Sequence, residues 1–291
     1  MSGKVLTRVI GAPLLLAALA GIVYFDWRQG RPLAVTVLLG AFAVASYREL
    51  CAMGTLQGLK PARELGSLML MLAFGSQLWL VLKGWAPADI PTVVLAWTVG
   101  LLVMLVVRHG RFSPVDAGFS MLAFMYVALL LYVVWTLESL KQPATQMLYL
   151  AFLVAANKGS DMAAYGFGKL FGRHKLAPVV SPNKTWEGAI GGLVVGAGAG
   201  AIIIERTELR TLFASVEGGR MVPAPVWAIV LFACTVTIAA QFGDLVKSAI
   251  KRWAGVKDSG RLLPEFGGAL DMCDSFILSA PVAWVGLRCF A

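Results

Sequence analysis

The stretch GFSMLAFMYVALLLYVVWTL, residues 118–137, decides the kind of fold that this chain can adopt. It holds no charged residue, and a helix of about 20 apolar residues crosses the roughly 30 Å hydrocarbon core of a bilayer. Comparable runs precede and follow it. Together they predict about nine membrane-spanning helices: 7–25, 33–47, 66–82, 88–107, 118–137, 146–166, 187–204, 225–246 and 275–290. The predicted fold class is therefore all-α, a polytopic integral membrane protein.

The composition excludes an ordinary soluble domain. Hydrophobic residues make up 58% of the 291 positions and charged residues 14%, against about 25% charged in soluble domains. We expect one membrane-embedded unit, with N-terminal transmembrane helices over 1–145 and a C-terminal transmembrane region over 146–291 that carries the polar motifs described below. The first span follows Lys4 and Arg8 but lacks a small-residue cleavage site, so we interpret it as a retained helix and not as a signal peptide.

The distribution of positive charge predicts the orientation. Segments on one side of the predicted spans hold about two thirds of the Lys and Arg residues, which places the N-terminus in the cytoplasm and the C-terminus outside an inner (plasma) membrane. The net charge of +9 is then explained by topology and by attraction to anionic lipid headgroups, without a nucleic-acid partner. The four cysteines have no paired spacing, so neither a disulfide framework nor a zinc site is expected.

The first long polar stretch covers residues 157–187. Lys158 and Asp161 lie three residues apart near the end of an apolar span, where an ionisable pair suggests function; the alternative is an ion pair that only neutralises itself. Downstream, Thr185 or a neighbour is expected to cap a helix that begins near Trp186. A basic loop before a helix N-terminus can bind an anion, which makes Lys184 a candidate phosphate ligand.

Four glycines follow on one predicted helix face: Gly188, Gly192, Gly196 and Gly200. Small residues at intervals of four allow two membrane helices to approach closely. We interpret the stripe as a packing surface and not as a phosphate loop. The pattern leaves open whether the partner helix belongs to the same chain or to a second copy in a homodimer.

The second polar stretch, residues 241–275, is the strongest functional signal. If the preceding span continues as helix, one face carries Asp244, Lys247, Ser248 and Lys251. Asp271 and Asp274 share a face of the last helix in the same way. The Gly267–Gly268 turn lets backbone N–H groups approach a ligand.

Aspartates surrounded by cationic side chains indicate a particular chemistry. Carboxylate oxygens suit Mg²⁺, which usually takes one or two carboxylates together with substrate phosphates. Lys and Arg suit the remaining phosphate charge. The combination predicts phosphoryl or nucleotidyl transfer, in which catalysis is chiefly positioning and charge stabilisation. The alternative is a solvated charged loop with weak surface ion pairs.

At these residues the chain resembles the phosphatidate cytidylyltransferases, also called CDP-diacylglycerol synthases. The matching positions are Ser248, Lys251, Arg252, Lys257, Asp258, Ser259, Gly260, Pro264, Gly267, Gly268, Asp271 and Asp274, with an upstream block of Ser160, Asp161, Tyr165, Gly168, Ser181, Pro182 and Lys184–Gly188. Three positions depart from the family pattern: Phe266 replaces a usual His, Met272 a usual Arg, and Lys247 an often acidic residue. These departures motivate an alternative hypothesis of an inactive homologue.

The resemblance implies transfer of CMP from CTP to phosphatidic acid, with Mg²⁺ as cofactor and K⁺ as a further candidate ion. It implies three sets of site residues: Asp258, Asp271 and Lys257 as catalytic; Asp161, Asp258, Asp271 and Asp274 as metal ligands; and Lys184, Ser248, Lys251, Arg252, Gly267 and Gly268 as substrate-binding. Other lipid enzymes, such as a polyprenol kinase or a CDP-archaeol synthase, are alternatives. A transporter is less consistent, because its charges would lie near the bilayer midplane in repeated spans.

Overall fold

A computed structural model describes residues 20–83, 90–108, 112–140, 142–217, 220–260 and 267–290. The chain divides into two compact units. Unit 1 comprises Met1–Ser139 and Trp253–Cys273, and unit 2 comprises Leu140–Arg252 and Asp274–Ala291. Each unit is described by itself below.

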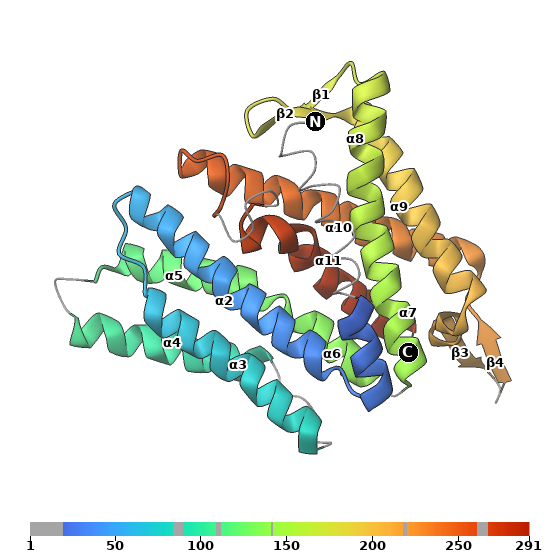
Figure 1. The fold of residues 1–291 in the computed structure, drawn as a ribbon, viewed down its shortest axis with the longest axis horizontal. Helices are drawn as coiled ribbons and strands as arrows, with labels where there is room; N and C mark the ends of the chain where they lie inside the picture. Colours follow the sequence, from blue (N-terminus) through green and yellow to red (C-terminus); the bar gives the residue numbers. More distant parts are fainter. Residues whose placement is uncertain are drawn as a thin grey trace. The chain divides into compact units, whose positions relative to one another are not determined.

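The helices of unit 1 are α2 (Leu33–Leu56), α3 (Arg63–Lys83), α4 (Ile90–Val107), α5 (Pro114–Ala128) and α6 (Leu131–Ser139) (Figure 1). Unit 2 holds α7 (Pro143–Val154), a π-helical turn η1 (Ala155–Gly159), α8 (Ser160–Phe171), α9 (Trp186–Arg206) and a 3₁₀ helix η2 (Glu208–Phe213). Two long helices belong to both units: α10 (Val226–Trp253) lies almost wholly in unit 2, and α11 (Ala269–Phe290) begins in unit 1.

Two β-hairpins interrupt the helices of unit 2. One pairs β1 (Lys175–Ala177) with β2 (Ser181–Thr185), and the other pairs β3 (Ala214–Glu217) with β4 (Arg220–Pro223), both antiparallel. The sequence analysis did not predict them, because each strand is only three to five residues long and has no extended period-2 pattern. They leave the chain overwhelmingly helical.

The predicted all-α membrane fold is confirmed. Within the described ranges, six helices are long and apolar enough to cross a membrane: Leu33–Leu56, Arg63–Lys83, Pro114–Ser139, Trp186–Arg206, Val226–Trp253 and Ala269–Phe290. The predicted spans 88–107 and 146–166 are also helical, as α4 and as the run from α7 to α8. Most of the first predicted span, 7–25, falls outside the described residues.

An aromatic core holds unit 1 together. The rings of Trp97 and Phe124 stack with centroids 4.5 Å apart, and Tyr47 meets both edge-on. All three side chains are buried, and the Tyr47 hydroxyl donates to the Ala62 carbonyl at 3.1 Å. Aromatic pairs in these geometries stabilise by about 0.5–1.5 kcal/mol beyond their buried area. This core fixes α2, and thereby the position of the acidic residue near its C-terminal end that is described below.

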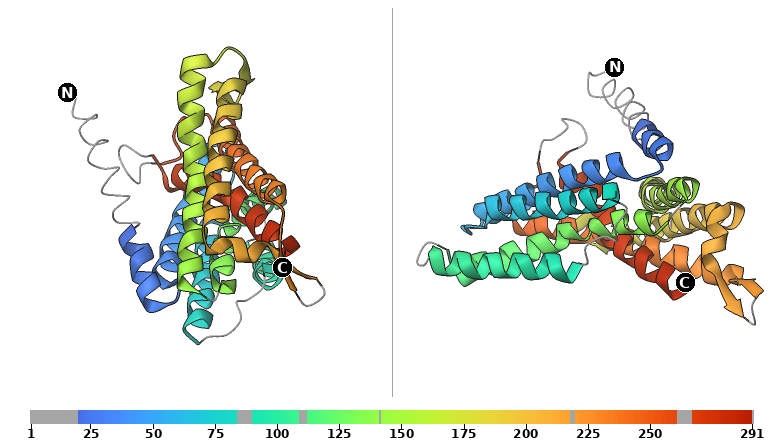
Figure 2. Two further views of the ribbon diagram at one scale, coloured as in Figure 1. Left: turned by 90° about the vertical axis from the view of Figure 1, so that its right-hand side faces the viewer. Right: turned by 90° about the horizontal axis from the view of Figure 1, so that it is seen from below.

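In unit 2 the glycine stripe of α9 packs against the run from α7 to α8, and the two lie side by side in both figures (Figures 1 and 2). A Cβ added at Gly192 would lie 2.8 Å from the Ser160 carbonyl oxygen, and one at Gly196 would lie 2.7 Å from that of Ala156. The predicted packing role is confirmed for these glycines. The partner helix belongs to the same chain.

Gly196→Ala is therefore expected to destabilise the protein, while Gly198→Ala on the same helix should not. The Gly196 substitution forces a methyl group against backbone and should lower the free energy of unfolding by about 1–3 kcal/mol. Gly198 has no atom within 4 Å of an added Cβ, so its alanine should raise stability by up to about 1 kcal/mol through helix propensity. Thermal unfolding in detergent micelles measures the difference; equal midpoints for the two variants would contradict the packing.

The π turn η1 lies at the junction of α7 and α8. It widens the helix by one residue over Ala155–Gly159 and precedes Asp161 on the first turn of α8. Asn157 in this turn is fully buried, and neither atom of its amide has a partner within the described part of the chain. Single π turns are frequent at functional sites. The position of η1 therefore makes the charged residues beside it candidates for a functional site.

Candidate active site

One group of charged side chains gathers in unit 2, here called the lysine–aspartate cluster. Its members come from η1, α8, β2, α10 and α11: Lys158, Asp161, Lys184, Asp244, Lys247 and Asp274. Lys158 Nζ lies 3.2 Å from Asp161 Oδ2, which confirms the predicted proximity of this pair. The cluster thus brings together residues from both polar stretches of the sequence.

The aspartates on α10 and α11 are joined through Lys247. Its Nζ lies 2.8 Å from Asp244 Oδ1 and also contacts Asp274 Oδ2. Lys184 Nζ binds the other oxygen of Asp244 at 2.5 Å. Asp274 is buried, and its Oδ1 accepts the backbone N–H and hydroxyl of Ser275 at 2.6 and 3.1 Å. Buried carboxylates are stable only when they are paired in this way.

Close helix packing positions these groups. A Cβ on Gly243 of α10 would lie 2.5 Å from the Asp274 carbonyl oxygen, so glycine allows α10 and α11 to approach beside the cluster. The Gln241 side-chain amide donates to Ser160 Oγ and to the Ala189 carbonyl, both at 3.0 Å. Gln241 therefore links α10 to α8 and α9 next to the charged residues.

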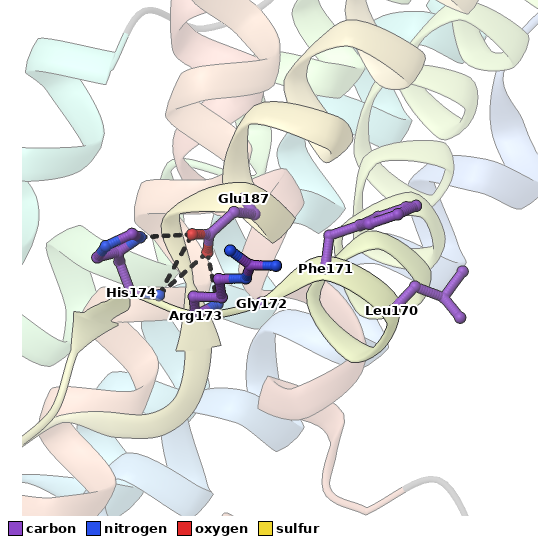
Figure 3. Close-up of a pocket in the computed structure, with 6 residues that line it drawn as sticks. All are labelled: Leu170, Phe171, Gly172, Arg173, His174 and Glu187. Atoms are coloured by element: carbon purple, nitrogen blue, oxygen red, sulfur yellow. Dashed lines mark hydrogen bonds and ion pairs between the residues drawn. The ribbon is translucent and has the colours of Figure 1, made fainter.

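The loop before α9 holds Lys184 in place. Thr185 Oγ1 accepts the Gly188 N–H at 3.1 Å, so the predicted N-cap is confirmed. Glu187 in the first turn accepts the N–H groups of Arg173 at 3.1 Å and His174 at 3.3 Å, and its Oε1 lies 2.6 Å from His174 Nδ1 (Figure 3). These bonds connect the β1–β2 hairpin to α9. The three residues that make these bonds also line an open pocket of about 440 Å³. Its lining residues are Leu170, Phe171, Gly172, Arg173, His174 and Glu187.

A second group lies in unit 1, here called the Ser259 cluster: Glu49, Ser259, Gly268 and Asp271. Ser259 Oγ lies 2.9 Å from Glu49 Oε2 and 2.9 Å from Asp271 Oδ2. Asp271 Oδ2 also accepts the N–H groups of Ser259 at 3.1 Å and of Gly268 at 3.4 Å. A hydroxyl has one proton, so it can donate to only one of these two carboxylates at a time.

Glu49 is the site residue that the sequence analysis missed. It lies near the C-terminal end of α2, and its two oxygens accept the Ala269 N–H at 2.8 Å and the Leu270 N–H at 3.0 Å. The first N–H groups of a helix have no partner within the helix, and negative charge there also complements the helix dipole. Glu49 therefore caps α11 and fixes the turn that begins it. The sequence signal that could have identified Glu49 is the presence of an acidic residue at the end of an apolar span.

The remaining predicted residues lie close to these clusters in sequence. Lys257 and Asp258 are exposed on the segment between α10 and α11. Ser248, Lys251 and Arg252 lie on the last turns of α10, and Arg252 Nε donates to the Val180 carbonyl at 3.2 Å. Gly267 has φ of 86°, a conformation that favours glycine. Pro264 and Phe266 lie outside the described residues.

The donor atoms of the two clusters differ in their suitability for Mg²⁺. Over the described ranges, no three His, Cys, Asp or Glu side chains are arranged to hold a metal ion. Mg²⁺ does not require three, since it commonly takes one or two carboxylates, water and substrate phosphates. The hard oxygens of Asp271 and Ser259 fit that demand. Asp161 and Asp274 fit it less well, because each already faces a lysine ammonium.

The sequence places this arrangement in a known class: residues 6–290 match the cytidylyltransferase family, and the chain belongs to that family of nucleotidyltransferases. The phosphatidate cytidylyltransferase of Staphylococcus aureus (strain COL) is 32% identical over 274 residues, which cover 92% of this chain and 95% of that protein. The phosphatidate cytidylyltransferase of Staphylococcus haemolyticus (strain JCSC1435) is 37% identical over 189 residues, covering 65% of this chain and 66% of that protein. The resemblance inferred from the motifs is confirmed.

Proposed function

We propose that this membrane enzyme transfers CMP from CTP to phosphatidic acid, giving CDP-diacylglycerol and pyrophosphate. The observation that carries the proposal is the match to a phosphatidate cytidylyltransferase over 92% of the chain. The site chemistry agrees, because carboxylates and ammonium groups are what a reaction between two phosphate-bearing substrates requires.

The proposed reaction needs no strong general base. An oxygen of the phosphatidate phosphate forms a bond to the α-phosphorus of CTP, and the bond to the bridging oxygen of the β-phosphate breaks, so that pyrophosphate leaves with the electron pair. The phosphate monoester is already ionised at neutral pH. The protein must hold two polyanions together, and cationic side chains reduce their mutual repulsion. Lys257, which is exposed, is the phosphate ligand that we propose in unit 1. For Lys251 and Arg252 on the end of α10, phosphate binding stays a prediction from the resemblance.

We assign the cofactor role to Mg²⁺, with Asp271 and Asp258 of unit 1 as its proposed protein ligands. When bound, the ion would neutralise charge on the CTP phosphates. Asp271 is held by N–H groups of Ser259 and Gly268, so its carboxylate is positioned before any ligand arrives. K⁺ stays a prediction from the resemblance.

The proposed location is the inner (plasma) membrane, with the site at the cytoplasmic surface. The support is the excess of Lys and Arg on that side of the predicted spans and the position of the polar motifs at span ends. CTP could then reach the site from the cytoplasm while the acyl chains of phosphatidate stay in the bilayer.

The test is formation of CDP-diacylglycerol from labelled CTP and phosphatidic acid by the purified full-length protein in detergent micelles. We expect product and pyrophosphate in equal amounts with Mg²⁺, at least about 10²-fold less after chelation, and recovery when Mg²⁺ is returned. If the folded protein gives no product with phosphatidate but gives product with another lipid phosphate, that lipid replaces phosphatidate as the proposed acceptor. Absence with every acceptor would favour an inactive homologue.

A further inference from the structure

Lys247 occupies the place between two carboxylates where a cation is needed. Its Nζ lies 2.8 Å from Asp244 Oδ1 and contacts Asp274 Oδ2, and its side chain is only 9% exposed. The ammonium reaches this position from within the chain, one helical turn after Asp244 on α10. Two carboxylates brought together from different helices would repel each other without a positive charge between them.

The other oxygens of these aspartates are also satisfied. Lys184 binds Asp244 Oδ2 at 2.5 Å. Asp274 Oδ1 accepts two hydrogen bonds from Ser275 and lies 3.9 Å from Lys158 Nζ. With Asp161 paired to Lys158, three ammonium groups balance the three carboxylates of the lysine–aspartate cluster. A divalent ion added here would leave two unbalanced positive charges beside the buried side chains of Lys247 and Asp274, where Coulomb repulsion is weakly screened.

We propose that Lys247 is a tethered cation. Its ammonium takes the place of a divalent ion between Asp244 and Asp274, so these two carboxylates position a lysine and do not bind metal. The inference rests on the proposed function in one respect, namely that the reaction uses Mg²⁺. It deepens that proposal, because it assigns Mg²⁺ to the Ser259 cluster through Asp271 and excludes it from the lysine–aspartate cluster.

Binding of Mn²⁺ as a spectroscopic substitute for Mg²⁺ tests the proposal without turnover. Electron paramagnetic resonance of the purified full-length protein in detergent gives the concentration of free Mn²⁺ and therefore its dissociation constant. Asp244→Asn and Asp274→Asn should leave that constant within about twofold of wild type, whereas Asp271→Asn should raise it at least about tenfold. A tenfold rise in either of the first two variants would overturn the proposal.

Lys247→Met supplies the converse measurement. Met has a similar length and no charge, so the variant leaves two carboxylates facing each other and should bind one Mn²⁺ more than wild type. Lys247→Arg keeps the charge and should bind no additional ion. An unchanged count in folded Lys247→Met would also overturn the proposal. Removing one partner of a buried pair can prevent folding, and in that case the aspartate variants decide the question by themselves.

The two proposals can fail separately. Mn²⁺ binding is measured in the absence of CTP and lipid, so a protein without transferase activity still gives a result for Lys247. If CDP-diacylglycerol is formed but Asp244→Asn weakens Mn²⁺ binding tenfold, the function stands and the tethered-cation role is wrong. If no product is formed and Asp244→Asn leaves Mn²⁺ binding unchanged, the reverse holds.

Discussion

Asp271→Asn is expected to reduce kcat for CDP-diacylglycerol formation by about 10²–10³-fold, the range for loss of one electrostatic stabiliser in a transition state. The substitution removes the charge but keeps an oxygen that can accept the N–H groups of Ser259 and Gly268. The fold should therefore persist while the proposed metal ligand is lost. Steady-state kinetics across a range of Mg²⁺ concentrations, with a thermal unfolding curve for each protein, separate the two effects.

The matched control for Asp271 is Glu64→Gln. Glu64 lies on α3, and its side chain is 77% exposed in an ion pair with Arg48, a type of contact that contributes little. The control should retain wild-type activity and stability. An Asp271→Asn enzyme with normal kcat at saturating Mg²⁺ would exclude this carboxylate from the chemistry and move the proposed metal site to other residues.

Glu49→Gln is expected to lower kcat/KM by about 10²-fold, although Glu49 has no assigned contact with substrate. Loss of precise placement alone can have an effect of this size. The amide that replaces one oxygen would point a donor at the N–H groups of Ala269 and Leu270, or at Ser259. A buried donor left without an acceptor costs about 1–3 kcal/mol. The start of α11 should then open more often, and Asp271 should lose its fixed position.

Hydrogen exchange distinguishes this positioning role from a general loss of stability. The amides of Ala269 and Leu270 should exchange faster in Glu49→Gln, while those in the middle of α9 should keep wild-type rates. Glu49→Asp keeps the charge on a shorter side chain and should recover part of the activity. Uniformly faster exchange across both units, or normal exchange at α11 with reduced activity, would contradict the assignment.

Local signals in the sequence predicted much of this structure. Apolar runs gave the helices, the Thr185 cap followed from a polar residue before a helical pattern, and the spacing of Asp271 and Asp274 gave two carboxylates on one helix. Each signal depends on residues within a few turns of each other. The glycine stripe of α9 predicted close packing for the same reason, but its partner helix required the structure.

What the sequence could not predict depends on long-range contacts. Glu49 and Ser259 meet across 210 positions, and no periodicity relates them. The spacing placed Lys247 on the same helix face as Asp244, but its bridging position between Asp244 and Asp274 depends on how α10 and α11 pack. Phe266 lies in the segment from 261 to 266, outside the described residues. The effect of replacing the usual His at this position therefore stays a prediction.

The π turn at Ala155–Gly159 constrains how this gene can tolerate changes in length. One residue is the difference between a π turn and uninterrupted α-helix, and one residue corresponds to a rotation of about 100° about the helix axis. A single-codon deletion there could still leave a helix able to cross the bilayer. It would turn Asp161 away from Ser275 of α11 or turn α7 away from α9, so selection against such deletions would come from the alignment of helix faces and not from membrane thickness.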